Sequence, residues 1–374
     1  MVEPLQLLQE LVSIPSVSGQ EGVAAGYLVN RMADLGYRSY IDEAGNAVGV
    51  LEQPDSEGRI TFEGVLMGHI DTVPGQIPVE IRDGCLYGRG TVDAKGPLAA
   101  FVLAAAQTNL APGTRLIVAG AVEEEAATSK GAWFLVDHLP AQEGEQNSRS
   151  PDFCIIGEPS GGDAVTLGYK GRALFDYTWS QEMSHTAGPE QAAAEKAVTW
   201  WNEVRAYADS FNKNCRGVFD QLSPSLRFIK THSNGMCDSV TAKVVVRIPP
   251  GVDLDTFEAD IRRLAVDAQV CMYSQVPAYR SQRNTPLVRV FSNVLRQNGF
   301  LPRLKVKTGT SDMNVVGPRW GCPIVAYGPG DSRLDHTPNE HLEIEKYFQA
   351  ITTLIQVLEQ AQEVQHEFMP VFYH

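Results

Sequence analysis

The sequence lacks closely spaced cysteines. Its 374 residues include six cysteines (Cys85, Cys154, Cys215, Cys237, Cys271 and Cys322), and none forms a Cys-x-x-Cys pair. This scatter disfavours a thiolate zinc site or a disulfide framework. It is typical of small buried apolar residues in a protein of the reducing cytoplasm.

The chain also lacks long apolar runs and an excess of positive charge. No apolar run approaches the roughly 20 residues needed to span a membrane, and residues 1–4 do not resemble the start of a signal peptide. The formal net charge of −14 disfavours binding to nucleic acids or anionic membranes. We therefore expect a cytoplasmic protein with no nucleic-acid partner and no membrane partner.

Motifs of three other enzyme classes are missing. The sequence has no Gly-x-x-x-x-Gly-Lys-Ser/Thr phosphate loop, which disfavours an ATP-dependent ligase. It has no Gly-x-Ser-x-Gly elbow, which disfavours a Ser-His-Asp hydrolase. Gly88-Arg89-Gly90 does not begin a dinucleotide fingerprint, because Asp93 stands where the third glycine belongs.

What the sequence does contain is an alternation of helix and strand patterns, which predicts an α/β sheet covered by helices. Helical spacing of apolar residues occurs at 5–12, 22–35 and 96–110, and buried-strand runs occur at 64–68, 115–119 and 153–157. The same texture resumes near the C-terminus, with a helix at 286–297, a strand at 324–327 and a helix at 342–360.

The middle of the chain has a different pattern. Strands are expected at 173–179, 226–231, 240–248 and 270–275, with helices at 189–207 and 254–268. The order β-α-β-β-α-β is the ferredoxin-like arrangement. We therefore expect an α/β domain in two parts, residues 1–170 and 281–374, with a ferredoxin-like α+β domain inserted at 171–280.

Acidic and histidine residues recur where strands end. His69 and Asp71 follow the strand at 64–68 and are two residues apart, so they project on the same side. A carboxylate beside a histidine suits a metal ligand with the group that orients it. A solvated histidine and a capping aspartate in a turn would also explain the pair.

Four more segments extend this pattern. Asp93 lies at the entrance of the helix at 96–110, where a carboxylate also suits the helix N-terminus. The run Glu123-Glu124-Glu125 follows a strand, Glu158 follows another, and His336 lies in the segment Asp335–Glu340. Three adjacent carboxylates repel one another unless cations compensate them. Together these segments predict a site for two divalent cations with nitrogen and oxygen ligands.

In this order the motifs resemble the M20 family of metallopeptidases and amidohydrolases, and the resemblance covers essentially the whole chain. It implies a zinc-peptidase-like mixed sheet with covering helices, and an inserted ferredoxin-like domain that acts as a lid and in dimerisation. It also implies two divalent cations per subunit, zinc or alternatively cobalt, and a homodimer.

The resemblance assigns roles by position. His69 and Glu158 would bind one metal, Glu125 and His336 the other, and Asp93 would bridge them. Asp71 would orient His69, and Glu124 would be the general base, a register chosen within the triple glutamate by the position of Gly131. The bridging aspartate would precede a cis peptide, Asp93-Ala94. His185 would stabilise the oxyanion across a dimer interface.

Substrate contacts are also implied, although each residue could instead serve the surface or the fold. The segment Gly309–Asp312 resembles the family loop that faces the substrate, which points to Thr310 and Ser311. Lys170, Arg247 and Arg280 stand at or near positions of cations that bind the substrate carboxylate. The segment Asn234–Ser239 departs from the family pattern, with Asp238 near the place of an asparagine.

Several segments are most similar to one subgroup, among them Gly68–Gly75, Val92–Ala99 and Lys307–Asn314. That subgroup releases lysine or ornithine from the γ-carboxyl of the C-terminal glutamate of a small acidic amino-group carrier protein, in lysine or arginine biosynthesis. A deacetylase of a small N-acyl amino acid, such as acetylornithine or acetyllysine, would need the same metal site. A non-catalytic binding relative is the alternative from another class.

Overall fold

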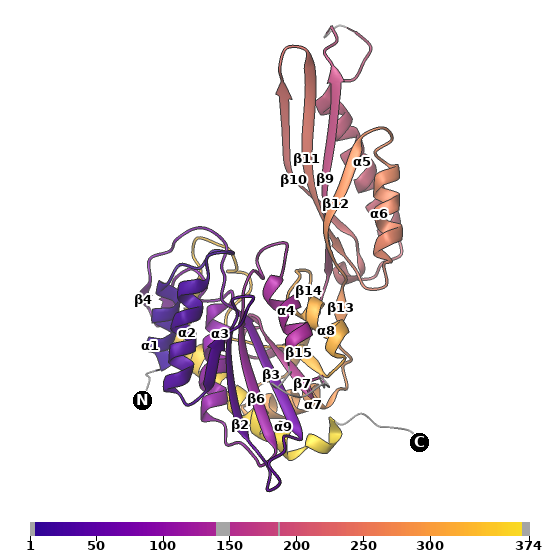
Figure 1. Cartoon of the computed structure of the whole chain (residues 1–374). Helices are drawn as coiled ribbons and strands as arrows, with labels where there is room; N and C mark the ends of the chain where they lie inside the picture. Colours follow the sequence, from indigo (N-terminus) through magenta and orange to yellow (C-terminus); the bar gives the residue numbers. More distant parts are fainter. Residues whose placement is uncertain (1–3, 140–149, 186–187, 369–374) are drawn as a thin grey trace. The chain divides into compact units, whose positions relative to one another are not determined.

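The computed structural model describes residues 4–139, 150–185 and 188–368. The chain forms two compact units (Figure 1). Unit 1 comprises Met1–Gly168, Ser281–Lys305 and Ser311–His374, and unit 2 comprises Tyr169–Arg280 and Val306–Thr310. Residues 1–3, which belong to the N-terminal segment expected not to be a signal peptide, lie outside the described part, as does Thr186 beside His185. In the described ranges, no helix is long and apolar enough to cross a membrane.

Unit 1 is built on a mixed sheet with the strand order β1-β2-β6-β3-β7-β15-β8, and β14 pairs with β8. The strands are β1 (Arg38–Ile41), β2 (Ala47–Gln53), β3 (Phe62–His69), β6 (Thr114–Ala121), β7 (Phe153–Gly157), β8 (Ala164–Tyr169), β14 (Arg303–Lys307) and β15 (Ile324–Ala326). Residues of β3, β6 and β7 are buried along the whole length of each strand. These are the continuous apolar runs expected of strands covered on both faces.

The helices of unit 1 are α1 (Pro4–Ser13), α2 (Gly22–Asp34), α3 (Lys95–Gln107), α4 (Lys130–His138), α7 (Pro286–Gln297), α8 (Met313–Trp320) and α9 (Ile344–Glu363), and a short 3₁₀ helix, η2, follows at Gln365–Glu367. Helix α3 contacts β3, β6 and β7 as well as α1 and α9. It is therefore apolar all round, and even Lys95 in its first turn is buried, with its ammonium donating to the carbonyl oxygens of Leu11 (3.0 Å) and Ile14 (2.6 Å).

Four neighbouring strands of this sheet, β6, β3, β7 and β15, run parallel. Their carboxyl ends are in register, because His69 pairs with Ala121, Gly68 with Gly157, and Ala326 with Ile156. The loops that follow these strands therefore leave the sheet at one edge, where open α/β sheets place their ligand sites.

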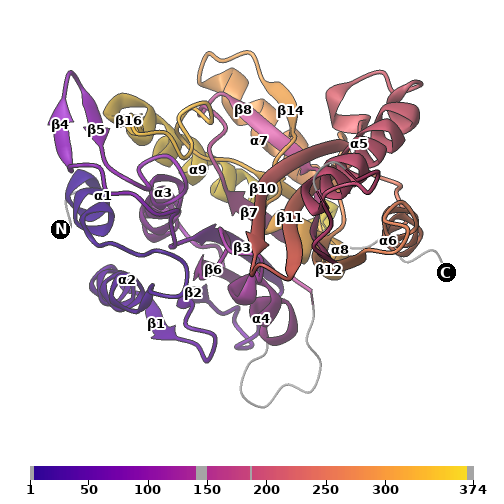
Figure 2. The ribbon, with the colours of Figure 1, turned by 90° about the horizontal axis from the view of Figure 1, so that it is seen from above.

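A small antiparallel sheet joins two of the site-bearing segments. Its strands are β4 (Glu80–Arg82), β5 (Cys85–Tyr87) and β16 (His341–Glu343), in the order β16-β5-β4. Leu342 pairs with Leu86, and both are buried. Both views place the β4–β5 hairpin near α1 (Figure 1, Figure 2). The pairing brings the chain just after His336 to the chain just before Asp93.

Unit 2 is a four-stranded antiparallel sheet in the order β10-β11-β9-β12. Its elements are β9 (Gly171–Glu182), α5 (Ala193–Asn212), the 3₁₀ helix η1 (Val218–Asp220), β10 (Ser223–Ser233), β11 (Cys237–Ile248), α6 (Leu254–Arg263), β12 (Gln269–Val276) and β13 (Tyr279–Arg280). The two helices pack on the sheet around a core that includes Phe175, Tyr177, Trp200 and Phe257.

The expected fold class is confirmed: a mixed α/β sheet with covering helices and a separate antiparallel α+β unit in β-α-β-β-α-β order. The sequence patterns did not predict several strands of this sheet, among them β1, β2, β8 and β14, or the helices α4 and α8. Helix α8 has eight residues and contains Pro318. Elements this short have little periodicity, and their conformation depends on tertiary contacts.

Candidate metal centre

His69 and Asp71 occupy the carboxyl end of β3, and both are almost completely buried. His69 Nδ1 lies 2.9 Å from the backbone oxygen of Asp71 and 3.4 Å from its Oδ1. With two acceptors before it, Nδ1 carries the proton and Nε2 faces the opposite way. This is the arrangement in which a second group fixes the tautomer of a metal-binding imidazole.

Asp93 lies between two histidines. Its Oδ1 is 3.2 Å from His69 Nε2, and its Oδ2 is 3.0 Å from His336 Nε2. His336 Nε2 is also 2.7 Å from Glu125 Oε1. The peptide Asp93-Ala94 is cis, as the resemblance implied. One aspartate therefore contacts a histidine with each oxygen, the position expected of a carboxylate shared by two cations.

The donor set fits a divalent cation. Ligand atoms of His69, Asp93 and Glu125 all lie within 4.8 Å of one another. Imidazole nitrogen and carboxylate oxygen are ligands that zinc, cobalt and manganese accept. Each histidine directs Nε2 at a carboxylate oxygen, so either a proton or a cation must lie between the two atoms.

In the metal-free protein, protons fill this role. Hydrogen bonds with Asp93 and then Glu125 raise the pKa of His336 to about 10. Burial lowers the pKa of His69, but its hydrogen bonds with Asp71 and Asp93 outweigh burial and raise it well above its usual value. Burial raises the pKa of Asp93, but the hydrogen bonds from His336 and His69 leave it well below normal. The site therefore stabilises positive charge at both histidines.

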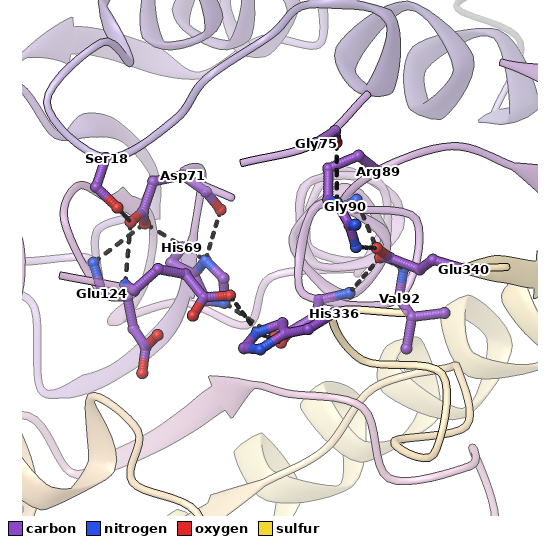
Figure 3. A network of polar contacts seen from close by, with 12 residues as sticks. Ser18, His69, Asp71, Gly75, Arg89, Gly90, Val92, Glu124, His336 and Glu340 are labelled. Carbon is purple, nitrogen blue, oxygen red and sulfur yellow. Dashed lines mark hydrogen bonds and ion pairs between the residues drawn. The ribbon is translucent and has the colours of Figure 1, made fainter. Parts of the chain in front are cut away.

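Glu124 has the opposite electrostatic environment. Burial raises its pKa well above the usual value, and the charges of Glu158, Asp312 and Glu125 add to the rise, against a lowering by His69. Its carboxyl group is drawn apart from the hydrogen-bonded histidines in Figure 3. A glutamate with a raised pKa beside a metal site suits proton transfer.

The loop that carries the three glutamates is held through its backbone N–H groups by the carboxylate of Asp71. Asp71 accepts hydrogen bonds from the backbone N–H groups of Glu124 (3.1 Å) and Glu125 (3.0 Å), and from the hydroxyl of Ser18 (2.7 Å). A Cβ atom at Gly131 would lie 2.3 Å from Asn46 Oδ1 and 2.5 Å from Val122 N. Position 131 thus has no room for a side chain where the loop closes on Val122.

Four of the five predicted ligands are joined by side-chain distances of 3.2 Å or less, and the fifth is placed by its charge. His69, Asp93, Glu125 and His336 contact one another, whereas Glu158 is buried just after β7 and is near enough to Glu124 for its charge to raise that pKa. His185 belongs to unit 2 and is exposed, with its backbone oxygen accepting from the N–H of Gly188 at 2.7 Å.

The predicted substrate contacts fall into two groups. Lys170 is fully buried, and its ammonium donates to the carbonyl oxygens of Val218 (3.1 Å) and Gln221 and to Ser223 Oγ (2.9 Å), which indicates a structural role inside unit 2. Arg280 is exposed, with its guanidinium 5.8 Å from the ring centroid of Phe219.

Thr310 and Ser311 lie in the loop after β14. Thr310 Oγ1 accepts from Arg247 Nη1 at 2.6 Å and donates to the backbone oxygen of Lys170 at 3.0 Å. Ser311 is buried in unit 1, and its Oγ accepts from the N–H of Met313 at 3.3 Å. These hydroxyls already have partners within the protein.

Three residues of the site region had no role in the sequence interpretation. Asp312 is 3% exposed, and burial raises its pKa to about 7. Glu340 is fully buried and forms an ion pair with Arg89, with 2.6 Å between Glu340 Oε2 and Arg89 Nη1. Glu340 stands in the quoted segment Asp335–Glu340 and Arg89 beside Gly88 and Gly90, but only the fold shows that they meet.

A mixed α/β sheet with a buried histidine and carboxylates at the ends of its parallel strands, completed by a second, half-exposed histidine, defines a metal-dependent amidohydrolase. Peptidase family M20/M25/M40 matches residues 65–360. The chain belongs to this family.

Proteins with similar sequences carry more specific names. The chain is 39% identical to LysW-lysine hydrolase of Deinococcus radiodurans, over 94% of this chain and 95% of that protein. It is 41% identical to a putative LysW-lysine/LysW-ornithine hydrolase of Thermococcus kodakarensis, over 96% of this chain and 92% of that protein.

Solved structures share the fold at lower identity. An M20 family metallo-carboxypeptidase, Sso-CP2 of Sulfolobus solfataricus, has a TM-score of 0.75 and 17% identity, covering 96% of this chain and 99% of that one. The Bacillus subtilis protein YXEP, described as a dinuclear metal-binding peptidase of the M20 family, has a TM-score of 0.67 and 12% identity, covering 95% and 97%.

Proposed function

We propose that this enzyme hydrolyses the amide that joins lysine or ornithine to the γ-carboxyl of the C-terminal glutamate of an amino-group carrier protein. The observation that carries the proposal is near-complete alignment, at 39–41% identity, with proteins named for hydrolysis of LysW-lysine or LysW-ornithine. The contacts that join His69, Asp93, Glu125 and the half-exposed His336 support an amide-cleaving metal site in this chain.

The proposed cofactor is a pair of divalent cations, zinc or alternatively cobalt. His69 and Glu158 would hold one cation, Glu125 and His336 the other, and Asp93 both. Bound there, the cations would lower the pKa of a water molecule and polarise the amide carbonyl. The contacts of Asp93 with both histidines support its shared role.

In the proposed mechanism Glu124 removes the proton from the attacking water and delivers it to the leaving nitrogen. Its raised pKa supports both halves of this transfer, since the group must accept a proton and then hold it. Asp71 keeps His69 in one tautomer, supported by the 2.9 Å and 3.4 Å contacts with Nδ1.

Unit 2 is proposed to act as a lid and in homodimer formation. His185, exposed on this unit, would donate a hydrogen bond to the oxyanion of the reacting amide in the partner subunit. Arg280, Thr310 and Ser311 would contact the substrate. Lys170 would orient Thr310, because its backbone oxygen accepts a hydrogen bond from the Thr310 hydroxyl.

An acidic carrier protein requires a docking surface on a chain of net charge −14. A cleft of about 560 Å³ in unit 1 is lined by four cations, Arg303, Lys305, Arg333 and Lys346. Arg303 pairs with Asp163 and Arg333 with Asp331, which leaves the lining with a net positive charge. It also includes Ser160, two residues after Glu158, and Arg333 lies three residues before His336. This cationic cleft is the proposed docking surface.

The deciding experiment measures amine release by metal-free enzyme with zinc or cobalt added back. The substrates are Nα-acetylornithine, Nε-acetyllysine and carrier-protein C-terminal peptides ending in γ-glutamyl-lysine or γ-glutamyl-ornithine. Metal-dependent release mainly from the γ-glutamyl peptides is the expected result. Preference for an acetyl substrate would make the enzyme a small-molecule deacetylase, and binding without any turnover would indicate a non-catalytic relative.

A further inference from the structure

Glu340 forms a concentrated set of hydrogen bonds beside the metal site (Figure 3). Its Oε1 accepts from the backbone N–H groups of Gly90 (2.9 Å), Val92 (2.9 Å) and Asp93 (3.2 Å). Its Oε2 accepts from Arg89 Nη1 at 2.6 Å. The side chain is fully buried, where an ionised carboxylate is costly unless such partners compensate it.

These contacts join three segments that carry proposed metal ligands. Glu340 lies four residues after His336, and it binds the backbone of Asp93 itself. Arg89 Nε also donates to the backbone oxygen of Gly75 at 3.2 Å, in the loop that follows His69 and Asp71. One carboxylate with its arginine therefore fixes the loops of His69, Asp93 and His336 relative to one another.

The same arrangement occurs on the other side of the site. Asp71 accepts the N–H groups of Glu124 and Glu125, just as Glu340 accepts those of the loop ending at Asp93. In each case a buried carboxylate holds the backbone of a ligand-bearing loop. The pairing of Leu342 with Leu86 already closes the small sheet, so three N–H groups converging on Glu340 are more than that sheet requires.

We propose that Glu340, with Arg89, is a positioning residue of the metal centre: it fixes the Asp93 loop so that the Asp93 carboxylate can be shared by the two cations. The inference rests on the proposed two-cation site. It does not depend on which amide is the substrate.

The test is Glu340→Gln, because the change preserves shape and removes one acceptor. Whichever way the amide turns, its NH₂ group faces either the Arg89 guanidinium or the three backbone N–H groups, and donors cannot pair with donors. The matched control is Glu343→Gln in β16, since the Glu343 side chain is 52% exposed and pairs with Lys346 on the surface.

Cobalt(II) binding to the metal-free variants is measured by calorimetry and by the visible absorption spectrum, with thermal unfolding of the metal-free protein as the measure of folding. We expect Glu340→Gln to weaken cobalt binding by roughly 10–100-fold and to change the spectrum, while Glu343→Gln binds like wild type. A lower unfolding temperature with unchanged cobalt affinity and spectrum would overturn the proposal and leave Glu340 a purely structural residue.

If Glu340→Gln does not fold, Arg89→Met is judged by the same criterion, since it leaves Glu340 its backbone partners. Weakened cobalt binding supports the inference, and wild-type binding overturns it. Failure of wild-type protein to bind two cations would instead contradict the proposed function, so the two outcomes are distinguishable.

Discussion

The carboxylate of Asp71 accepts a hydrogen bond from the backbone N–H of Glu124 at 3.1 Å. The same carboxylate lies 3.4 Å from His69 Nδ1. The group that orients the proposed ligand His69 therefore also positions the backbone of the proposed base, so one buried carboxylate links the two residues.

Glu124→Gln should bind metal normally but lose turnover by about 10²–10⁴-fold, because the amide cannot accept the proton of the attacking water. Steady-state kinetics and metal analysis of the purified variant check this. Glu123→Gln is the matched control: Glu123 accepts from the hydroxyl of Thr128 at 2.5 Å, on the same loop. Loss of turnover in the control with near-normal activity of Glu124→Gln would show that the register within the triple glutamate is wrong.

His185→Ala should lower kcat by roughly 10²–10³-fold, the usual effect of removing an oxyanion donor, with little change in KM. His232→Ala, another exposed histidine of unit 2, is the control. Both are compared with wild type on the γ-glutamyl peptide, with the oligomeric state checked by sedimentation. Unchanged kinetics for His185→Ala would make it an ordinary surface residue.

Charge reversal in the cationic cleft should act only on the carrier-linked substrate. We expect Lys305→Glu with Lys346→Glu to reduce kcat/KM for the intact carrier protein by roughly 3–10-fold, more at low salt, since electrostatic complementarity at an interface mainly governs association. The short γ-glutamyl peptide should be hydrolysed as by wild type.

The control for the cleft is Arg59→Glu. Arg59 is exposed and lies just before the amino end of β3, whereas His69 lies at the carboxyl end of that strand. An equal loss with this control, or no loss with the cleft variant, would remove the cleft as the docking surface.

Asp312 should make the stability of the metal-free protein depend on pH. Burial raises its pKa from 3.8 to about 7, so the folded protein holds a proton that the unfolded chain releases. Its contribution to the free energy of unfolding is therefore largest below about pH 4 and is lost as the pH rises through about 7. Asp312→Asn stays neutral and should remove this dependence.

The measurement is urea unfolding of both proteins in chelator at several pH values between 4.5 and 7.5. As the pH rises, the free energy of unfolding of wild type should fall relative to that of Asp312→Asn. A difference that stays constant across this range would contradict the assignment of a protonated carboxyl at position 312.

Much of the site could be predicted because parallel strands have a local signature. Apolar runs such as 64–68 and 153–157 end in polar residues, and strands of one parallel sheet bring their carboxyl ends to one edge. The segments that carry histidine, aspartate or glutamate are therefore expected to converge. Within them, the resemblance to the M20 family singles out His69, Asp93, Glu125 and His336, although the chain separates these residues by up to 267 positions. The β-α-β-β-α-β order of the middle of the chain could be predicted from the periodicity of apolar residues in each element.

Only the tertiary structure decided what depends on contacts between distant segments. Nothing in the surroundings of Glu340 along the chain indicates that it binds the backbone of Asp93, and nothing beside Lys170 indicates that backbone carbonyl groups surround its ammonium. The cationic cleft likewise combines residues from four separate stretches. Periodicity records which face of an element is buried, whereas the partner it meets, and so the pKa and role of each buried charge, is set by packing.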